Sequence, residues 1–260
     1  MADDVLIRFR GVRKAFGSKV VYQHLDLDVE RGKALTIVGG SGVGKSVMLK
    51  MLIGLLKPDR GSIVFDGKEV TTMNAEELSL LRRRIAMLFQ GGALFDSQNV
   101  RANVAYGLEE HFRYRMTRAE IEERVAWALE LVGLPGVEQM WPADLSGGMK
   151  KRVALARAIA VRPEVVLYDE PTTGLDPINT ARVNHLIMGL QRKLRITSIV
   201  VTHDMKSAFT ISDHLAMVRD GRIICAAGKE QFYSSTDQRV HDFIEGVAPV
   251  EEDVETLLQA

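Results

Sequence analysis

The chain has 260 residues, which is enough for one large domain or for a core with a subdomain, and its 46% hydrophobic and 26% charged residues are ordinary for a globular protein. Lys plus Arg equals Asp plus Glu at 34 each, so the net charge of zero argues against a dedicated nucleic-acid binder, and we expect no nucleic-acid partner. The single cysteine, Cys225, excludes an internal disulfide and is typical of a reducing compartment.

The amino-terminal segment carries Asp3 and Asp4 and has no apolar stretch of the kind that a secretory signal requires. No uncharged apolar run approaches the roughly 20 residues that a membrane-spanning helix needs. We therefore expect a cytosolic protein, a location that also allows contact with a membrane protein.

The first half of the chain is predicted to begin with strands and to alternate between strands and helices from about residue 34. The nearly all-apolar ALTIVGG predicts a strand that is covered on both faces. Asn74, followed three residues later by Glu77, resembles a capping box at the start of a helix. In chain order we expect strands at 5–12, 25–29 and 34–40, a helix at about 44–56, a strand at 62–70, a helix at 75–84 and a strand at 85–90.

The second half is predicted to contain a mainly helical stretch and then to return to alternating strands and helices. Asp220-Gly221, between two apolar runs, is typical of a hairpin turn. In chain order we expect a mainly helical segment at 99–162, a strand at 165–169, a helix at 179–193, a strand at 197–202, a hairpin at 215–228 and a short helix at 239–244. This order predicts an α/β parallel sheet with a small antiparallel β subdomain and a helical subdomain.

The strongest motif is GGSGVGKS, residues 39–46, which fits G-x-x-x-x-G-K-[ST] and lies between an apolar strand and a helix. The backbone N–H groups of such a loop point at phosphate oxygens, and the following helix adds its dipole. A glycine-rich turn without a ligand is the alternative. The expected nucleotide contacts are Gly39, Gly40, Ser41, Gly42, Val43, Gly44, Lys45, Ser46 and Val47, with Lys45 on the β- and γ-phosphates and the Ser46 hydroxyl on Mg²⁺.

Two carboxylates, Asp169 and Glu170, end the apolar strand VVLYD. The carboxyl end of a strand faces the crevice in which open α/β sheets bind ligands. Asp169 is expected to hold Mg²⁺ through its water shell, and Glu170 to orient or deprotonate the attacking water. Surface acids are the alternative, and the upstream phosphate loop argues against it.

The segment LSGGMKKRVALARAI, which starts at Leu145, closely resembles the signature of ATP-binding cassette (ABC) ATPases. The motifs stand in the order of that family: phosphate loop, Gln90, signature, Asp169-Glu170, the Gly174-Leu175-Asp176 turn and His203. The resemblance covers about residues 5–230. It implies a P-loop NTPase (RecA-like) fold, in which a parallel-sheet core carries an antiparallel β subdomain and a helical signature subdomain.

The family pattern also implies the roles of single residues and the cofactors ATP and Mg²⁺. Phe16 matches the aromatic residue that stacks on adenine, with core packing as the alternative. Gln90 matches the glutamine that reaches Mg²⁺ and the attacking water, and His203 matches the histidine at the γ-phosphate; a structural role is the alternative for each. Asp176 matches a loop that contacts the other subunit. Glu170, His203 and Gln90 are thus the expected catalytic residues.

Ser146 is a good N-cap, and Gly147 and Gly148 expose backbone N–H groups at a helix start, which makes an anion site. In the family this surface meets the phosphate loop of a second copy, so the resemblance implies a homodimer that closes around two ATP molecules. Met149 departs from the commoner Gln and cannot donate a side-chain hydrogen bond. Either that contact is dispensable or the closed dimer is weaker. The run Lys150-Lys151-Arg152 is expected to be a solvated helix face.

A single cassette without long insertions favours a transporter motor over the translation and DNA-maintenance members of the family. FQGGALFDSQNVRANVAYGLEEH resembles the ATPases of Mla- and Mce-type lipid transport systems. That resemblance implies phospholipid movement between bacterial membranes, integral-membrane permease subunits, an Mce-domain substrate-binding protein and a possible small regulatory subunit. The chain would then lie on the cytoplasmic side of the inner membrane. The alternatives are a motor for import of a small polar solute and a regulatory ATP-binding module without turnover.

The sequence leaves two interpretations open for the loop that contains Leu94 and Phe95, and two for the carboxyl-terminal tail. Leu94 and Phe95 follow the Gly91-Gly92 pair, and they either pack in the core or form the floor of a groove for a permease helix. The family pattern implies an ATP-binding domain over 5–246, with its helical subdomain at about 92–162, and a tail at 247–260. This acidic tail is either a frayed end or a segment that docks on the partner ATPase subunit or on a regulator.

Overall fold

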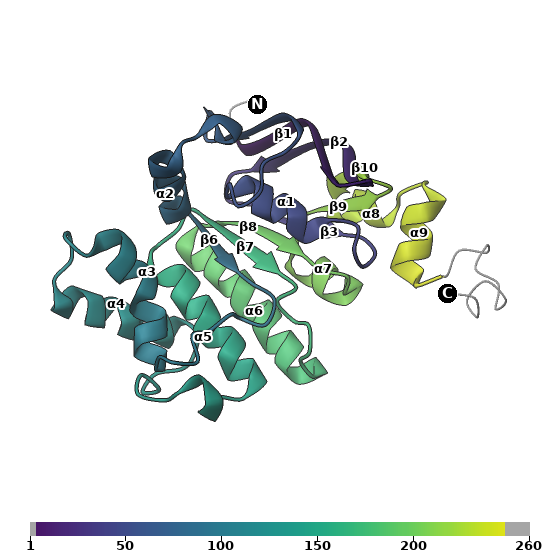
Figure 1. The fold of residues 1–260 in the computed structure, drawn as a ribbon. Helices are drawn as coiled ribbons and strands as arrows, with labels where there is room; N and C mark the ends of the chain where they lie inside the picture. The colour runs from purple at the N-terminus through teal and green to yellow at the C-terminus, as the bar shows by residue number, and fades with distance from the viewer. Residues whose placement is uncertain (1–3, 248–260) are drawn as a thin grey trace.

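The computed structural model describes residues 4–247, and its strands form two sheets (Figure 1). One sheet is antiparallel and has the order β2-β1-β4-β5, with β1 (Val5–Phe16), β2 (Lys19–Glu30), β4 (Arg60–Phe65) and β5 (Lys68–Glu69). The other has the order β10-β9-β3-β8-β7-β6, with β3 (Ala34–Val38), β6 (Ile85–Leu88), β7 (Val165–Asp169), β8 (Thr197–Val201), β9 (His214–Arg219) and β10 (Arg222–Gly228). In this second sheet every neighbouring pair is parallel except β9 with β10.

Helices and short 3₁₀ turns connect these strands. The α-helices are α1 (Lys45–Leu52), α2 (Ala75–Arg84), α3 (Val100–Phe112), α4 (Arg118–Leu131), α5 (Gly147–Ala160), α6 (Pro177–Leu194), α7 (Met205–Ile211), α8 (Lys229–Tyr233) and α9 (Gln238–Glu245). The 3₁₀ turns are η1 (Val70–Thr72) and η2 (Pro142–Asp144). In Figure 1, α1 lies between the two sheets, whereas α3, α4 and α5 gather on the other side of the parallel sheet.

Most predicted elements are present, and the differences have local causes. The capping box of α2 is confirmed, because Asn74 Oδ1 accepts from Glu77 N while Glu77 accepts from Asn74 N. The first helix ends at Leu52 rather than near 56, because Gly54 adopts a left-handed conformation and stops it before Pro58. The strands at 5–12 and 25–29 belong to one longer hairpin, and the short helices α7 and α8 were not predicted.

The parallel sheet is buried on both faces, and β7 shows how. Val165 and Leu167 pack with the antiparallel sheet and α1, whereas Val166 and Tyr168 pack with the core of α3 to α6. Successive side chains of a strand point to opposite faces, so an apolar run can serve two cores at once. The sequence before Asp169 is uninterruptedly apolar because each of its residues faces one of the two cores.

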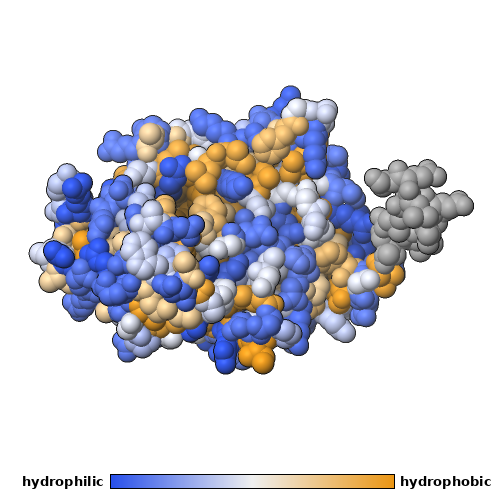
Figure 2. Space-filling view, turned by 60° about the horizontal axis from the view of Figure 1, so that its bottom comes forward, coloured by the Kyte–Doolittle hydropathy of each residue, from blue (hydrophilic) through white to orange (hydrophobic). Residues whose placement is uncertain are grey.

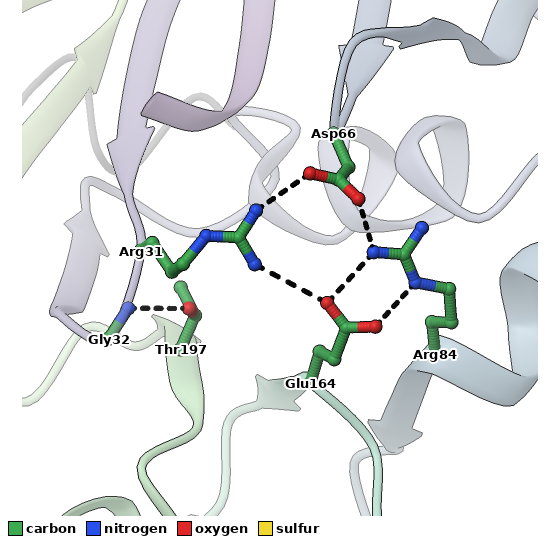
Figure 3. A network of polar contacts seen from close by, with 6 residues as sticks. All are labelled: Arg31, Gly32, Asp66, Arg84, Glu164 and Thr197. Carbon is green, nitrogen blue, oxygen red and sulfur yellow. Dashed lines mark hydrogen bonds and ion pairs between the residues drawn. The ribbon is translucent and has the colours of Figure 1, made fainter. Parts of the chain in front are cut away.

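A network of four charged residues joins the antiparallel sheet to the parallel sheet (Figure 3). Arg84 Nε donates to Glu164 Oε1 and Arg84 Nη2 to Asp66 Oδ2, both at 2.5 Å. Arg31 lies across from it, 2.7 Å from Asp66 and 3.4 Å from Glu164. Arg84 also lies 4.6 Å from the ring centre of Phe65. These contacts hold the turn after β4 against the amino ends of β6 and β7.

The described surface is mixed in character. On the face shown in Figure 2, apolar residues form separate patches that are interrupted by hydrophilic ones. Between residues 4 and 247, none of the helices combines the length and the apolar character that crossing a bilayer demands. The predicted short helix at 239–244 is confirmed as α9, whereas residues 248–260 of the predicted tail lie outside the described residues.

Candidate functional site

The glycine-rich loop lies between β3 and α1, and its shape is held by β2. Gly44 has a φ of 105°, and a Cβ there would stand 2.3 Å from Val21 Cγ1. The Tyr22 hydroxyl donates to Gly44 O at 2.9 Å. Only glycine tolerates both this backbone conformation and this close approach. The loop is therefore pre-shaped by the strand behind it, and Tyr22 is a supporting residue that the motif alone does not reveal.

Lys45 is buried inside this loop. Its Nζ donates to Gly39 O at 2.7 Å and to Gly40 O at 3.0 Å, and it lies 4.0 Å from Glu170 Oε1. Burial lowers the pKa of Lys45, while the negative charges of Glu170 and Asp169 oppose that change. The loop thus places one cation, surrounded by backbone dipoles, where a phosphate chain would be neutralised.

Ser46 and Asp169 meet beside the loop. The Ser46 hydroxyl donates to Asp169 Oδ1 at 2.7 Å, and Asp169 is buried at 6% exposure. Two oxygen donors so close together suit Mg²⁺, which is commonly held by one or two protein ligands plus substrate phosphates. Within residues 4–247 there is no cluster of three or more acidic, His or Cys side chains suited to a metal ion. The pair of Ser46 and Asp169 fits a Mg²⁺ ion whose remaining ligands come from water and substrate phosphates.

Glu170 follows directly, at the end of β7, in a left-handed conformation with a φ of 50°. Its N–H donates to Val201 O at 3.0 Å, which ties it to β8. Thr173 Oγ1 donates to Glu170 Oε2 at 3.1 Å, and Thr202 Oγ1 donates to the same oxygen at 3.3 Å. A non-glycine residue in this conformation is uncommon and is often found at functional sites. The sequence motifs did not identify Thr173, although Thr202 immediately precedes His203.

Five predicted residues converge at this end of the parallel sheet: Lys45, Ser46, Asp169, Glu170 and His203. His203 comes from the end of β8, and its Nδ1 lies 3.0 Å from Glu170 Oε1. The imidazole is exposed, whereas the Glu170 side chain is only 12% exposed. The arrangement offers a carboxylate, a cation and an accessible imidazole at one end of the parallel sheet, and phosphoryl transfer to water requires such groups.

Gln90 and Phe16 lie at the surface. Gln90 is exposed and follows β6 by two residues. Phe16 ends β1 with 47% of its area exposed, and Lys14 Nζ lies 5.2 Å from its ring centre. Phe16 therefore does not pack in the core, and its ring is free to stack on a planar ligand.

The signature segment lies at the start of α5, away from the phosphate loop of the same chain (Figure 1). Ser146 is the N-cap, and its Oγ accepts from Met149 N at 3.3 Å. Gly147 and Gly148 are the first residues of the helix. The start of α5 and the glycine-rich loop are therefore separate from each other within one chain.

Neighbouring residues explain how this surface is held. Gly148 packs against Asn179, and a Cβ on Gly148 would lie 3.2 Å from Asn179 Oδ1. Asp176 is the N-cap of α6 and accepts from the backbone N–H groups of Ile178 and Asn179 at 2.9 Å and 3.0 Å. Met149 is half-buried and packs on the helical core. The departure at position 149 thus adds an apolar contact within this chain.

The basic run on α5 differs from its prediction. Lys151 is buried at 7% exposure, so the expectation of a solvated helix face is wrong for this residue. Burial lowers the pKa of Lys151, opposed by the charges of Glu170 and Asp169. The run was misjudged because α5 is the central helix of its core and is covered on most sides.

Comparison with known proteins places this site in a family. A family model described as ABC transporter matches residues 22–173, which is more than half of the chain. The chain belongs to the ABC transporter ATP-binding family. The resemblance drawn from the motifs is therefore confirmed, and the chain is an ABC ATPase that binds nucleotide.

Among curated relatives, this ABC ATPase is 40% identical over 241 residues to the intermembrane phospholipid transport system ATP-binding protein MlaF of Haemophilus influenzae, with 93% of this chain and 90% of that protein covered. It is 39% identical to the MlaF protein of Escherichia coli K12, with 94% and 90% covered. It is also 40% identical to the probable ribonucleotide transport ATP-binding protein mkl of Mycobacterium leprae, with 93% and 69% covered.

Solved structures agree with the fold of this ABC ATPase. The dimeric post-hydrolysis structure of the ATP-binding cassette MJ0796 bound to ADP and Pi has a TM-score of 0.79 and 29% identity, over 86% of this chain and 99% of that one. The cbiO1 protein of Clostridium perfringens, part of the ABC transporter complex cbiONQ, has a TM-score of 0.82 and 27% identity, over 99% and 100%. The predicted fold class, a P-loop NTPase core with two subdomains, is confirmed.

Proposed function

We propose that this ABC ATPase is the motor subunit of a transporter that moves phospholipid between bacterial membranes, a system of the Mla/Mce type. The observation that carries the proposal is the identity of about 40% with MlaF over 90% of the length of that protein. A match of this extent reaches beyond the nucleotide-binding motifs that all members of the family share. An identity of this extent supports the same kind of transport system for this chain.

The geometry supports the following division of work at the site. Lys45 and the loop N–H groups bind the phosphates of ATP, and the ring of Phe16 carries the adenine. Glu170, held by Thr173 and Thr202, orients and polarises the attacking water. His203 contacts the γ-phosphate, and its position beside Glu170 keeps both groups at the same reacting atom.

Ser46, Asp169 and Gln90 are the residues that would hold Mg²⁺ in the presence of nucleotide. The close pair of Ser46 and Asp169 oxygens supports this assignment. When bound, Mg²⁺ neutralises charge on the β- and γ-phosphates. Gln90 stands on the loop after β6, so its reach depends on how that loop is held.

The active form that we propose is a homodimer. The start of α5 exposes backbone N–H groups suited to an anion, at Ser146, Gly147 and Gly148. This helix start lies apart from the glycine-rich loop of the same chain, so it is available to the ATP bound by another copy. Two copies arranged head-to-tail would bring this surface, together with Asp176, onto the ATP bound by the partner. We further propose that residues 5–246 form the ATP-binding domain, that about 92–162 form its helical subdomain, and that the tail at 247–260 contacts a partner.

The proposed partners are integral-membrane permease subunits, an Mce-domain substrate-binding protein and a small regulatory subunit, with the chain peripheral on the cytoplasmic side of the inner membrane. Phe95 and Tyr106 support a permease contact, because their rings form a tilted pair at 4.8 Å while 37% and 42% of their areas are exposed. Exposed paired aromatics are typical of interaction surfaces. Leu94 instead packs partly on the helical core, which favours the core interpretation for that residue.

A second candidate function is a motor for import of a small polar solute, which is favoured by the name of the mkl relative. The deciding experiment is purification of the chain with its membrane subunits, followed by mass spectrometry of bound lipid. Co-purified phospholipid, and ATPase activity that responds to phospholipid, would support our proposal. A complex that holds no lipid, and whose ATPase responds only to a soluble solute, would refute it.

A further inference from the structure

The loop after Gln90 has an uncommon backbone. Gly91, Gly92 and Ala93 all have left-handed φ angles, of 83°, 84° and 45°. Glycine adopts this conformation without cost, but Ala93 does not. A non-glycine residue stays in such a conformation only where its surroundings hold it there. Contacts from outside the turn therefore hold residues 91–93 in this conformation.

Arg157 of α5 holds the left-handed turn at residues 91–93. Arg157 Nη2 donates to Gly92 O at 2.7 Å, and Nη1 donates to Ala93 O at 2.8 Å. Arg157 is half-buried, and burial lowers the pKa of its guanidinium. Its planar fork suits two adjacent acceptors, and short bonds from a charged donor are the strong ones. The two carbonyl groups of the turn are thereby tied to one point on the helix.

Packing adds to these bonds. Gly92 is buried against α5, where a Cβ would stand 3.2 Å from Ala154 Cβ and 3.5 Å from Lys150 O. The turn therefore lies directly on the helix that begins with the signature residues. A displacement of α5 has to carry the turn with it, because neither a gap nor a flexible side chain separates the two.

The same arginine reaches the exposed aromatic pair. The Arg157 guanidinium lies 5.6 Å from the ring centre of Phe95, and Phe95 pairs with Tyr106 of α3. The backbone of Phe95 is anchored by buried Asn103, which accepts from Phe95 N at 2.8 Å and donates to Phe95 O at 3.1 Å. One side chain thus touches both the turn after Gln90 and the surface proposed for the permease.

We propose that Arg157 is a positioning residue that makes Gln90 follow α5 and the Phe95–Tyr106 surface. Arg157 lies on the helix between these parts and has no role of its own in the proposed chemistry. Its side chain converts a movement of α5, or pressure on Phe95, into a movement of the turn that carries Gln90. The inference rests on the proposed function in two respects: Gln90 is taken as a residue of the hydrolytic site, and the Phe95–Tyr106 surface is taken as the permease contact.

The test uses the complete complex with its membrane subunits and compares Arg157→Met, Arg157→Lys and Arg152→Met. Arg152 is a matched control, because it lies on the same helix and also donates to two backbone carbonyls, those of Val132 and Gly133, at 3.4 Å and 3.1 Å. We expect Arg157→Met to lower kcat roughly 10- to 100-fold through misplacement of Gln90, with KM for ATP within about twofold. The kcat of Arg157→Lys should lie between that of Arg157→Met and that of wild type. The kcat of Arg152→Met should stay within about twofold of wild type.

Two measurements distinguish a specific loss of Gln90 positioning in Arg157→Met from a general loss of structure. Amide hydrogen exchange of the segment 89–97 should rise in Arg157→Met while that of β7 and α6 is unchanged. Ala93→Gly should restore part of the turnover of Arg157→Met, because glycine adopts the left-handed turn without support. Equal losses of kcat in Arg157→Met and Arg152→Met, or unchanged exchange at 89–97, would overturn the inference. Neither readout depends on which molecule is transported, so the lipid proposal is judged separately.

Discussion

His203 Nδ1 lies 3.0 Å from Oε1 of Glu170, and the two residues follow the carboxyl ends of the neighbouring parallel strands β8 and β7. The contact means that the candidate base and the candidate γ-phosphate contact are not independent, because a change in one alters the orientation of the other. Thr202 and Thr173 hold the second oxygen of Glu170. The carboxylate is therefore constrained from two sides before any substrate arrives.

Glu170→Gln should trap ATP in a stabilised dimer. The amide keeps the shape but cannot act as a base, so hydrolysis should fall by roughly 10²-fold or more while ATP binding is retained. Single-turnover hydrolysis and size-exclusion chromatography with ATP measure the two effects. Glu130→Gln, at an exposed position of α4, is the control. Unchanged turnover in Glu170→Gln would refute the role assigned to this carboxylate.

His203→Ala should slow hydrolysis by roughly 10²-fold, because one positioned donor to the developing charge is removed. ATP affinity should change much less, since the loop and Lys45 provide most of the phosphate contacts. The measurement is kcat against equilibrium binding of a fluorescent ATP analogue. His185→Ala, on the exposed side of α6, should behave as wild type. A normal kcat in His203→Ala would show that its contact with Glu170 is only structural.

Asp169→Asn should weaken the response to Mg²⁺ by about 10- to 100-fold, because Asp169 is expected to hold the ion through water and the neutral amide is a poorer partner. The measurement is ATPase activity as a function of Mg²⁺ concentration at saturating ATP. Asp144→Asn, in η2, provides a control of the same chemistry. If Asp169→Asn shows an unchanged Mg²⁺ midpoint, the pair that it forms with Ser46 has no part in metal binding.

Arg84→Met should destabilise the fold by about 1–2 kcal/mol at neutral pH, a small value because the network is partly exposed. Arg84 lowers the pKa of Glu164 and of Asp66 below their ordinary values. Carboxylates with a lowered pKa in the folded state stabilise it above their ordinary pKa, near 4, and lose this effect as the pH falls through the lowered value.

The difference in free energy of unfolding between wild type and Arg84→Met should therefore shrink as the pH drops below about 4. Urea titrations at several pH values measure it, and Arg118→Met is a suitable control because its side chain is 92% exposed. A difference that grows on acidification would contradict the ion-pair explanation.

Phe95→Asp should leave ATP binding intact and uncouple hydrolysis from transport. A carboxylate on this surface would lose the contact with Tyr106 and oppose an apolar partner helix. The measurement compares ATPase stimulation and transport in the reconstituted complex. Tyr114→Asp, where the side chain is 95% exposed, is the control. A stable and fully coupled Phe95→Asp complex would show that the aromatic pair does not face the permease.

Local patterns predicted much of this protein. The glycine-rich loop, the capping box at Asn74 and the apolar strand before Asp169 each contain their own physical cause within a few residues, so their elements follow from short-range rules. The order of motifs was enough to identify the family. Val165 and Leu167 facing one core, and Val166 and Tyr168 the other, follow from the two-residue period of a strand.

Other features required the tertiary structure, because they join residues that are distant in the chain. Lys151 appeared to lie on a solvated basic face and is buried, since three-dimensional packing covers α5 on most sides. The carbonyl groups held by Arg157 lie on a loop before two intervening helices, and no periodicity or spacing relates an arginine to them. The sequence by itself thus determined the family and the chemistry of the phosphate loop, which depend on local backbone shape. Only the folded chain decided which side chains hold Glu170 and the turn after Gln90, because those contacts depend on how the strands and helices pack.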